Sequence, residues 1–216
     1  MKKILLFTSI VALFASCTSK PSFELEVNIR NNNSLINKQF VVTQRIDGRI
    51  VYTDTLIIKK NDFLLKLPFK SPAILDVSIL KSNVHDIMMA SEKGKILLDI
   101  EGTKTHFSGT PLNDRLQNFY LGNDSVSLLN REYEKEYDLL SGTEQFTPQK
   151  REEFDQKFNQ LLRDNTDRII AFIKENIDNP IGEYYFSVNY LTFNPARKAE
   201  LKSFATEKLK KEFGIE

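Results

Sequence analysis

The chain has 216 residues, of which 41% are hydrophobic and 27% are charged, and it contains 16 Phe, 7 Tyr, one Cys and no Trp. The hydrophobic share excludes a disordered chain, and a single Cys excludes a disulfide framework, a dithiol redox pair and a cysteine-based zinc site. Because 30 Lys and Arg balance 29 Asp and Glu, the chain carries no basic field, and we expect no nucleic-acid partner.

The first seventeen residues predict export and lipid attachment. A positive start at residues 1–3 precedes an apolar run at residues 4–14 and then Ala15-Ser16-Cys17. As a helix, this run would rise roughly 16 Å, short of the roughly 30 Å bilayer core, which favours a signal peptide over residues 1–16 that is cleaved. Residues 14–17 resemble a bacterial lipobox, with Phe14 where Leu is usual, so lipidation is expected at Cys17. The alternative is an ordinary signal peptide followed by an accidental Cys.

The residues after Cys17 indicate where the lipid would hold the protein. Residues 17–22 contain Ser, Thr and Pro and are expected to form a tether. Thr18 stands where an Asp would resemble a signal for inner-membrane retention, and no acidic run resembling a surface-export tag follows. By this analogy we expect a membrane partner reached through the lipid anchor: the outer membrane, on its periplasmic face.

Alternating side chains predict an antiparallel β domain over residues 23–108. Phe23, Leu25 and Val27 alternate with polar residues, as expected for a strand with one buried face. Asp47-Gly48 predicts a tight turn between strands at 40–46 and 50–58. Further short strands are expected at 63–67, 73–80, 86–90 and 95–101. Seven or eight strands joined by short loops predict an antiparallel sandwich or an open barrel.

A change of pattern at Ser108 predicts a helical domain over residues 109–216, and hence an α+β fold. Thr110-Pro111, Thr147-Pro148 and Asn194-Pro195 mark three helix starts, each with a capping hydroxyl or amide before a proline. The first two helices carry apolar stripes, and residues 141–147 suit a loop between them, which predicts a long antiparallel hairpin. A third helix is expected to include Leu201 to Phe213. Asn179-Pro180 is interpreted as a stop signal before an aromatic segment.

Two polar residues lie within the apolar stripes of the hairpin. In an antiparallel pair closed by the 141–147 loop, Asn123 and Asn165 lie at equal height, with Phe119 opposite Ile169. We therefore expect the two amides to hydrogen-bond and to fix the register. The alternative is that Gly122-Asn123-Asp124 breaks the first helix and that both Asn face water.

Several short motifs together resemble a known family: the Bacteroidetes lipoprotein domain of unknown function that usually precedes a thioredoxin-like domain. The motifs are Asp54-Thr55, Phe63 after a turn, Pro72, Gly94-Lys95-Ile96, Ser108-Gly109-Thr110-Pro111-Leu112-Asn113, Phe172-Ile173-Lys174-Glu175-Asn176 and Asn179-Pro180. The resemblance spans roughly residues 22–213. Asn61-Asp62 departs from a glycine turn in the family, and the chain stops where the thioredoxin-like domain would begin. Because the chain has no Cys-x-x-Cys, the thiol–disulfide activity of longer relatives is not carried over.

Candidate chemical groups are few, and each has an ordinary structural interpretation. His85 and His106 would need to converge with carboxylates such as Asp86 or Asp99 to hold a metal, whereas exposed or hydrogen-bonded histidines are common in turns and at strand ends. No serine nucleophile motif and no phosphate-binding glycine loop is present. We therefore expect no catalytic residue, no metal site and no cofactor.

Charged and aromatic residues also gather in three stretches of the sequence. The acidic residues between Glu132 and Asp138 are interpreted as a solvated helix face rather than an acid–base pair. The basic residues from Arg197 to Lys211 would aid docking to acidic lipid or protein, but interspersed glutamates favour a solvated face. The aromatic residues from Tyr184 to Phe193 would suit sugar stacking, although helical core packing is favoured.

The sequence thus predicts a non-catalytic, membrane-anchored periplasmic lipoprotein that acts as a binding or assembly module. A protein partner is expected, and the small-molecule ligand, if any, is unknown. The alternatives are an accessory subunit of a separate thioredoxin-like redox protein, or an enzyme of unrecognised class.

Overall fold

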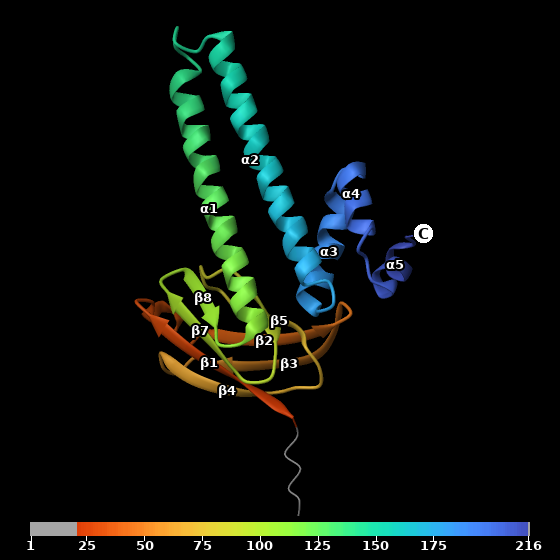
Figure 1. Cartoon of the computed structure of the whole chain (residues 1–216). Coiled ribbons are helices and arrows are strands. Elements are labelled where there is room, and N and C mark those ends of the chain that lie inside the picture. Colours follow the sequence, from red (N-terminus) through yellow and green to blue (C-terminus); the bar gives the residue numbers. More distant parts are fainter. Residues whose placement is uncertain (1–20, 216) are drawn as a thin grey trace, which may run out of the picture.

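The computed structural model describes residues 21–215, which form a β-sandwich followed by a long helix hairpin and three shorter helices (Figure 1). The predicted α+β class is confirmed, and of the two predicted β architectures the sheets are open rather than closed into a barrel. The predicted signal peptide, Cys17 and most of the tether lie outside the described residues. Among residues 21–215, no helix has the length and apolar character needed to cross a membrane.

Eight strands form two four-stranded sheets. Sheet A has the order β4-β1-β7-β8 and sheet B the order β3-β2-β5-β6. The strands are β1 (Ser22–Arg30), β2 (Gln39–Ile46), β3 (Arg49–Ile57), β4 (Asp62–Pro68), β5 (Ala73–Ile79), β6 (Ile87–Ser91), β7 (Lys95–Glu101) and β8 (Lys104–Ser108), with a 3-10 turn, η1 (Asn33–Leu35), after β1.

The alternating pattern of each strand places its apolar side chains between the sheets. Phe23, Leu25 and Val27 of β1 are almost fully buried, as predicted, and Phe40 of β2 packs edge-on against Phe63 of β4 with ring centroids 5.2 Å apart. The β2–β3 turn is also as predicted. Asp47 and Gly48 both have positive φ, 51° and 72°, the conformation of a tight hairpin whose twist matches that of the strands.

One strand pair differs from the antiparallel prediction. β1 and β7 run parallel, with Leu25 opposite Ile96 and Ile29 opposite Ile100. The chain changes sheet after β1, β3, β4 and β6, so β7 enters sheet A beside β1 by a long route rather than through a hairpin. Short loops predicted only hairpins, and this non-local pairing leaves no local signal in the sequence.

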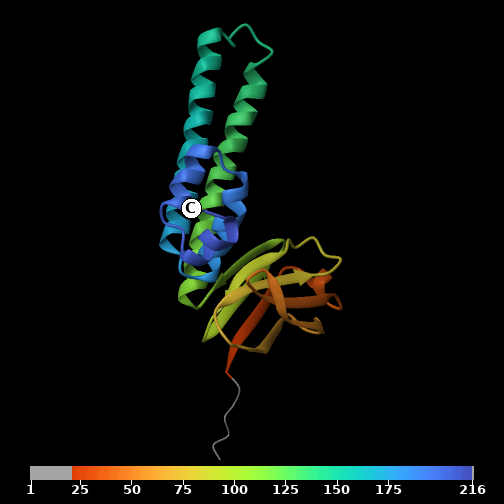
Figure 2. The same ribbon diagram turned by 90° about the vertical axis from the view of Figure 1, so that its right-hand side faces the viewer.

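Five α-helices follow the sandwich: α1 (Pro111–Leu140), α2 (Pro148–Glu175), α3 (Pro180–Thr192), α4 (Pro195–Lys202) and α5 (Glu207–Phe213). The long α1 and α2 form the predicted antiparallel hairpin, which stands away from the sandwich, while α3, α4 and α5 pack at the base of α2 (Figures 1 and 2). All three predicted helix starts are confirmed, because α1, α2 and α4 begin at Pro111, Pro148 and Pro195.

Two helical predictions need correction. The expected third helix is divided into α4 and α5, because Thr206 starts a new helix by accepting a hydrogen bond from Leu209 N–H at 3.3 Å. The aromatic segment after Asn179-Pro180 is itself helix α3. Asn179 caps it by accepting from the N–H groups of Ile181 and Gly182, so this Asn-Pro pair is a start as well as a stop.

Candidate functional site

The base of α1 joins the two sheets by side-chain amides. Asn113 is fully buried, accepts from Ala90 N–H and donates to Ala90 C=O, both at 2.9 Å. One turn further on, Gln117 Oε1 accepts from Phe107 N–H at 2.8 Å. Ala90 belongs to edge strand β6 and Phe107 to edge strand β8, so these amides satisfy backbone groups that an adjoining strand would otherwise pair.

The start of α1 is capped differently from the prediction. The Thr110 hydroxyl does not accept a backbone N–H of the helix; it accepts from Asn113 Nδ2 at 2.8 Å. Leu112 N–H instead donates to Glu92 Oε2 at 2.9 Å, and Gly109 N–H donates to Asp114 Oδ1. Because the Thr110 hydroxyl is bonded to the buried Asn113, the carboxylates of Glu92 and Asp114 accept from the N–H groups of Leu112 and Gly109 instead.

An aromatic cluster packs above this junction and connects α1, α2 and α3. The rings of Phe119 and Phe172 stack with centroids 4.0 Å apart, and the edge of Tyr185 meets both. Burial raises the pKa of Tyr185 far above its usual range, with a further contribution from the neighbouring Tyr120. Burial likewise raises the pKa of Tyr120. Both phenols are therefore neutral, and the Tyr120 hydroxyl donates to Met88 C=O of β6 at 3.5 Å.

Arg168 lies between α1 and α2, at the place where Asn123 and Asn165 were expected to hydrogen-bond directly to each other. Its Nη1 donates to Phe119 C=O at 3.0 Å, and its Nη2 donates to Asn165 Oδ1 at 2.9 Å and to Asn123 Oδ1. The guanidinium also lies over the Phe119 ring, 4.8 Å from the centroid. The direct Asn123–Asn165 bond was a wrong prediction: the structure brings the two amides together, but around a cation that the sequence reasoning missed.

The same site explains the glycine in the middle of α1. A Cβ on Gly122 would lie 2.5 Å from Arg168 Nη1, so glycine leaves room for the guanidinium. The alternative of a helix break at Gly122-Asn123-Asp124 is also wrong, because α1 continues unbroken to Leu140. Phe119, which was expected opposite Ile169, stacks on Phe172, about one turn further along α2.

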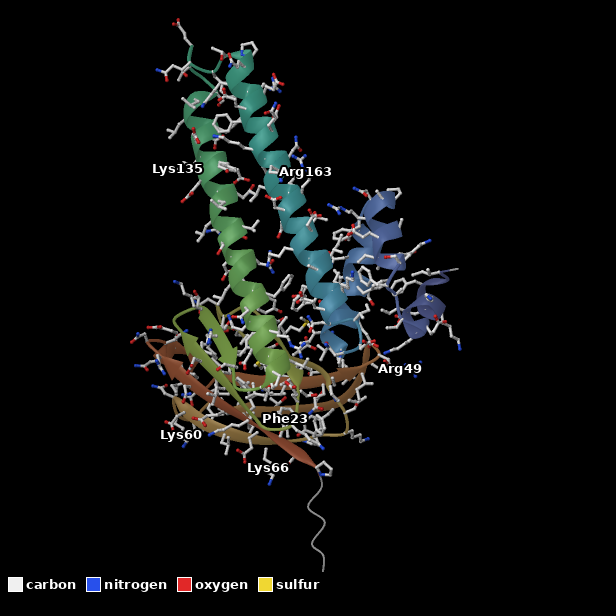
Figure 3. All side chains as sticks on the ribbon, in the orientation of Figure 1. Phe23, Arg49, Lys60, Lys66, Lys135 and Arg163 are labelled. Atoms are coloured by element: carbon white, nitrogen blue, oxygen red, sulfur yellow. The ribbon has the colours of Figure 1, made fainter. Side chains whose placement is uncertain are left out.

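Beyond Arg168 the hairpin becomes an exposed arm, which we define as residues 124–164. Tyr137, Phe146 and Phe154 contact one another near its tip, and Phe154 is the one buried residue of the arm. Charged side chains such as Lys135 and Arg163 lie along the arm (Figure 3). Several large apolar side chains of the arm are exposed: Leu128, Leu129, Leu139, Phe158 and Leu162. Phe158 and Leu162 line a shallow groove between the helices, opposite Asn130 and Glu134.

A cleft of about 490 Å³ lies where the β2–β3 turn and the start of β5 meet α3 and α5. Lys208 of α5 crosses its rim and donates to Asp47 of the turn and, at 2.7 Å, to Glu183 of α3. Burial acts to lower the pKa of Lys208, but its bonds to the two carboxylates outweigh this and raise it. Tyr184, from the aromatic segment, also lines the cleft and is 41% exposed, whereas Phe186 of that segment is fully buried.

The histidines and their candidate carboxylates do not form a cluster. His106 of β8 lies opposite Asp99 of β7 in sheet A, whereas His85 and Asp86 precede β6 of sheet B. Within residues 21–215 no group of three or more His, Cys, Asp or Glu is placed to hold a metal ion.

The charged clusters lie on helix surfaces. Glu132, Glu134, Glu136 and Asp138 are all exposed. Several basic residues near the C-terminus form ion pairs: Arg197 with Asp167 and Glu200, Lys208 with Asp47 and Glu183, and Lys210 with Glu207. The acidic residues of α1 therefore lie on a solvated face, whereas Lys208 joins Asp47 and Glu183 at the rim of the cleft.

Comparison with known proteins finds one match, which covers the sandwich and the start of α1. Residues 23–116 match a family described as Domain of unknown function (DUF4369), so the predicted resemblance to a domain of unknown function is confirmed over this segment. The match extends from β1 through the first turns of α1 and includes Asn113. No curated protein and no solved structure matches the chain.

Proposed function

We propose that the protein is a non-catalytic lipoprotein, anchored at the periplasmic face of the outer membrane, that binds a protein partner through its helical arm. One observation carries the proposal. β1 begins at Ser22 on the side of the sandwich opposite the arm, as both views agree (Figures 1 and 2). A lipid on Cys17 would therefore hold the sandwich near the bilayer and direct the arm away from it.

The dimensions and surface of the arm support a binding role. Helix α1 has 30 residues, which corresponds to roughly 45 Å of helix. Leu128 and Leu139 are 58% and 68% exposed on this projecting element. Single exposed apolar residues are ordinary, but several on one narrow projection mark a surface that a partner would cover.

Membrane fractionation tests the anchor. The full chain is expected in the membrane fraction with a diacylglyceryl mass on Cys17, and Cys17→Ser is expected to lose that modification and to leave the membrane fraction. Mass spectrometry that finds an unmodified Cys17 on membrane-associated mature protein would contradict the proposal.

Affinity capture from solubilised membranes tests the arm. Leu128→Gln/Leu139→Gln should lose proteins that the unsubstituted chain retains, with an unchanged thermal midpoint. The matched control is Leu64→Gln/Leu80→Gln, which replaces two leucines of similar exposure on the sandwich. If both double variants retain the same partners, the arm is not the binding surface. A thioredoxin-like protein among those partners would identify the role as a redox accessory.

A further inference from the structure

The arm rises from one side of the sandwich, and edge strand β4 lies on the other side. On the arm side, α1 binds the edge strands β6 and β8 through Asn113 and Gln117. β4 forms the far edge of sheet A (Figure 1), and Lys60 and Lys66 of this region lie on the side away from the helices (Figure 3). The surface around β4 therefore faces away from the arm.

This far side carries a positive charge. Residues 59–70, which include β4, contain four Lys and one Asp, a net charge of +3. We define the lysine surface as these four exposed residues, which lie in two pairs toward the two ends of β4: Lys59, Lys60, Lys66 and Lys70. Within residues 21–215 only Lys60 of the four forms an ion pair, with Asp62 at 3.5 Å. The other three ammonium groups are available to a further anion.

The carboxylates of the neighbouring strand β1 leave most of this charge uncompensated. Glu26 is paired with Lys95, and Glu24, which lies opposite Lys66, is half-buried. When Glu24, Glu26 and Lys95 are counted with residues 59–70, the net charge is still +2.

The arm has the opposite charge. Residues 124–164 contain six Lys and Arg and ten Asp and Glu, a net charge of −4. The fold thus separates positive charge on one side of the sandwich from negative charge on the element that projects from the other side. An anionic surface attracts the first and repels the second, so it would turn the molecule with the lysine surface toward it.

The chain before β1 limits how far the lysine surface can lie from a bilayer. Ser22 is paired with Pro68 at the end of β4, and Phe69 N–H donates to Pro21 C=O at 2.9 Å. Ser22 is five residues after Cys17, and a chain of that length reaches at most about 18 Å. A lipid on Cys17 would therefore keep this end of β4 within reach of the headgroups.

We propose that the lysine surface docks on anionic lipid headgroups of the membrane that holds Cys17, with β4 lying along the bilayer. The inference rests on the lipid anchor of the proposed function, and it adds the contact surface and the class of lipid. Each lysine near an anionic lipid surface strengthens the contact by about five-fold. Docking would hold the arm in one orientation, pointing away from the bilayer.

Fluorescence quenching in vesicles tests the docking. Asn61→Cys places a thiol before β4, roughly 20 Å along the strand from Ser22. In the lipidated full chain the sulfur of Cys17 is a thioether, so a dye labels the introduced cysteine alone. Acrylamide, a neutral quencher, should quench this dye about two-fold less in phosphatidylcholine vesicles with about one third phosphatidylglycerol than in phosphatidylcholine alone. Ser141→Cys, at the tip of the arm, is the control and should be quenched equally in both.

Charge reversal separates the position of the charge from the net charge. In the Asn61→Cys chain, reversal of three residues of the lysine surface should restore the quenching seen in neutral vesicles: Lys59→Glu/Lys66→Glu/Lys70→Glu. The matched control removes the same charge from three exposed residues of the arm and should keep the low quenching: Lys135→Glu/Lys157→Glu/Arg163→Glu.

The outcomes separate the docking from the anchor. Equal quenching of the Asn61→Cys dye in both kinds of vesicle would overturn the proposal, and it is the result expected if the lysine surface binds an acidic protein instead. Reversal on the lysine surface without effect, or an equal effect of reversal on the arm, would also overturn it. Mass spectrometry of each preparation verifies the lipid on Cys17, so these results would leave the anchor standing, whereas a preparation without the lipid would overturn anchor and docking together.

Discussion

Arg168 shows how one residue fixes the relation of two helices. Its guanidinium contacts Phe119, Asn123 and Asn165, while its Nε is buried without a hydrogen-bond partner among residues 21–215. Burial lowers the pKa of Arg168, but an arginine remains charged at neutral pH. A planar group with several donors suits three acceptors that converge from two helices, and an ammonium group does not reproduce this geometry.

Replacing Arg168 by lysine is therefore expected to destabilise the fold. Arg168→Lys keeps the charge but leaves acceptors around the site unpaired, and we expect a loss of about 1–3 kcal/mol in the free energy of unfolding. Urea unfolding measures it. Arg163→Lys, an exposed position on the same helix, should change the free energy by less than about 0.5 kcal/mol. Equal small effects at both positions would contradict the role given to Arg168.

Tyr185 predicts a loss of stability at alkaline pH. Its pKa in the folded protein is raised above the ordinary value of 10.0, mainly by burial, so the unfolded chain releases this proton first as the pH rises. The stabilisation that the protonated Tyr185 provides is complete below about pH 10 and is lost as the pH rises further. The free energy of unfolding then falls by up to about 1.4 kcal/mol per pH unit for this one proton. Urea unfolding from pH 8 to pH 11 should show a shallower decline for Tyr185→Phe. Identical slopes in the two proteins would contradict this.

The sequence predicted part of the contact between α1 and α2 around Arg168. Stripe spacing and loop length brought Asn123 and Asn165 to the same region, because helical geometry is local and regular. Arg168 was missed because a charged residue beside a stripe resembles many solvated ones. Asn113 and Gln117, one turn apart and adjacent to Leu112 and Leu116, did carry a signal: polar residues within a buried face need partners.

At the scale of elements, proline pairs were the most reliable signals. Three Thr-Pro or Asn-Pro pairs marked helix starts correctly. Asn179-Pro180 was predicted only as a helix stop, although it also marks the start of α3. The division of α4 from α5 depended on Thr206, which lacks a following proline. Strand boundaries agreed closely with alternation, but the parallel pairing of β1 with β7 depends on contacts between distant residues, which a local pattern does not contain.

The turn between α2 and α3 predicts a sharp difference between two glycines. A Cβ on Gly182 would lie 1.8 Å from Asn176 C=O, whereas a Cβ on Gly142 meets nothing within 4 Å. Gly182→Ala should destabilise the fold by about 1–3 kcal/mol through this clash, although alanine favours helices. Gly142→Ala in the α1–α2 loop should be nearly neutral. Thermal unfolding of the two variants provides the comparison, and equal midpoints would show that the backbone at Gly182 readily moves.

Across the whole molecule, the arm should be the least stable part. The sandwich core extends through both sheets to Phe119 and Phe172, whereas the arm consists of two paired helices with one buried residue, Phe154. Hydrogen exchange of the full chain should therefore show rapid exchange between residues 126 and 162 and slow exchange in β1, β2 and β5. Equal protection of arm and sheets would indicate that a contact covers the arm, and the same measurement on Leu128→Gln/Leu139→Gln would then locate that contact.

The attachment of α1 to both sheets has a mechanical consequence. The helix behaves as a stiff lever whose fulcrum is the pair Asn113 and Gln117, and Leu139 lies roughly 35 Å further along it. A sideways push at the tip would thus be magnified at the fulcrum. Asn113 is bound to sheet B and Gln117 to sheet A. The same sideways force on the arm would therefore tend to separate the two sheets and would act on the core of the sandwich.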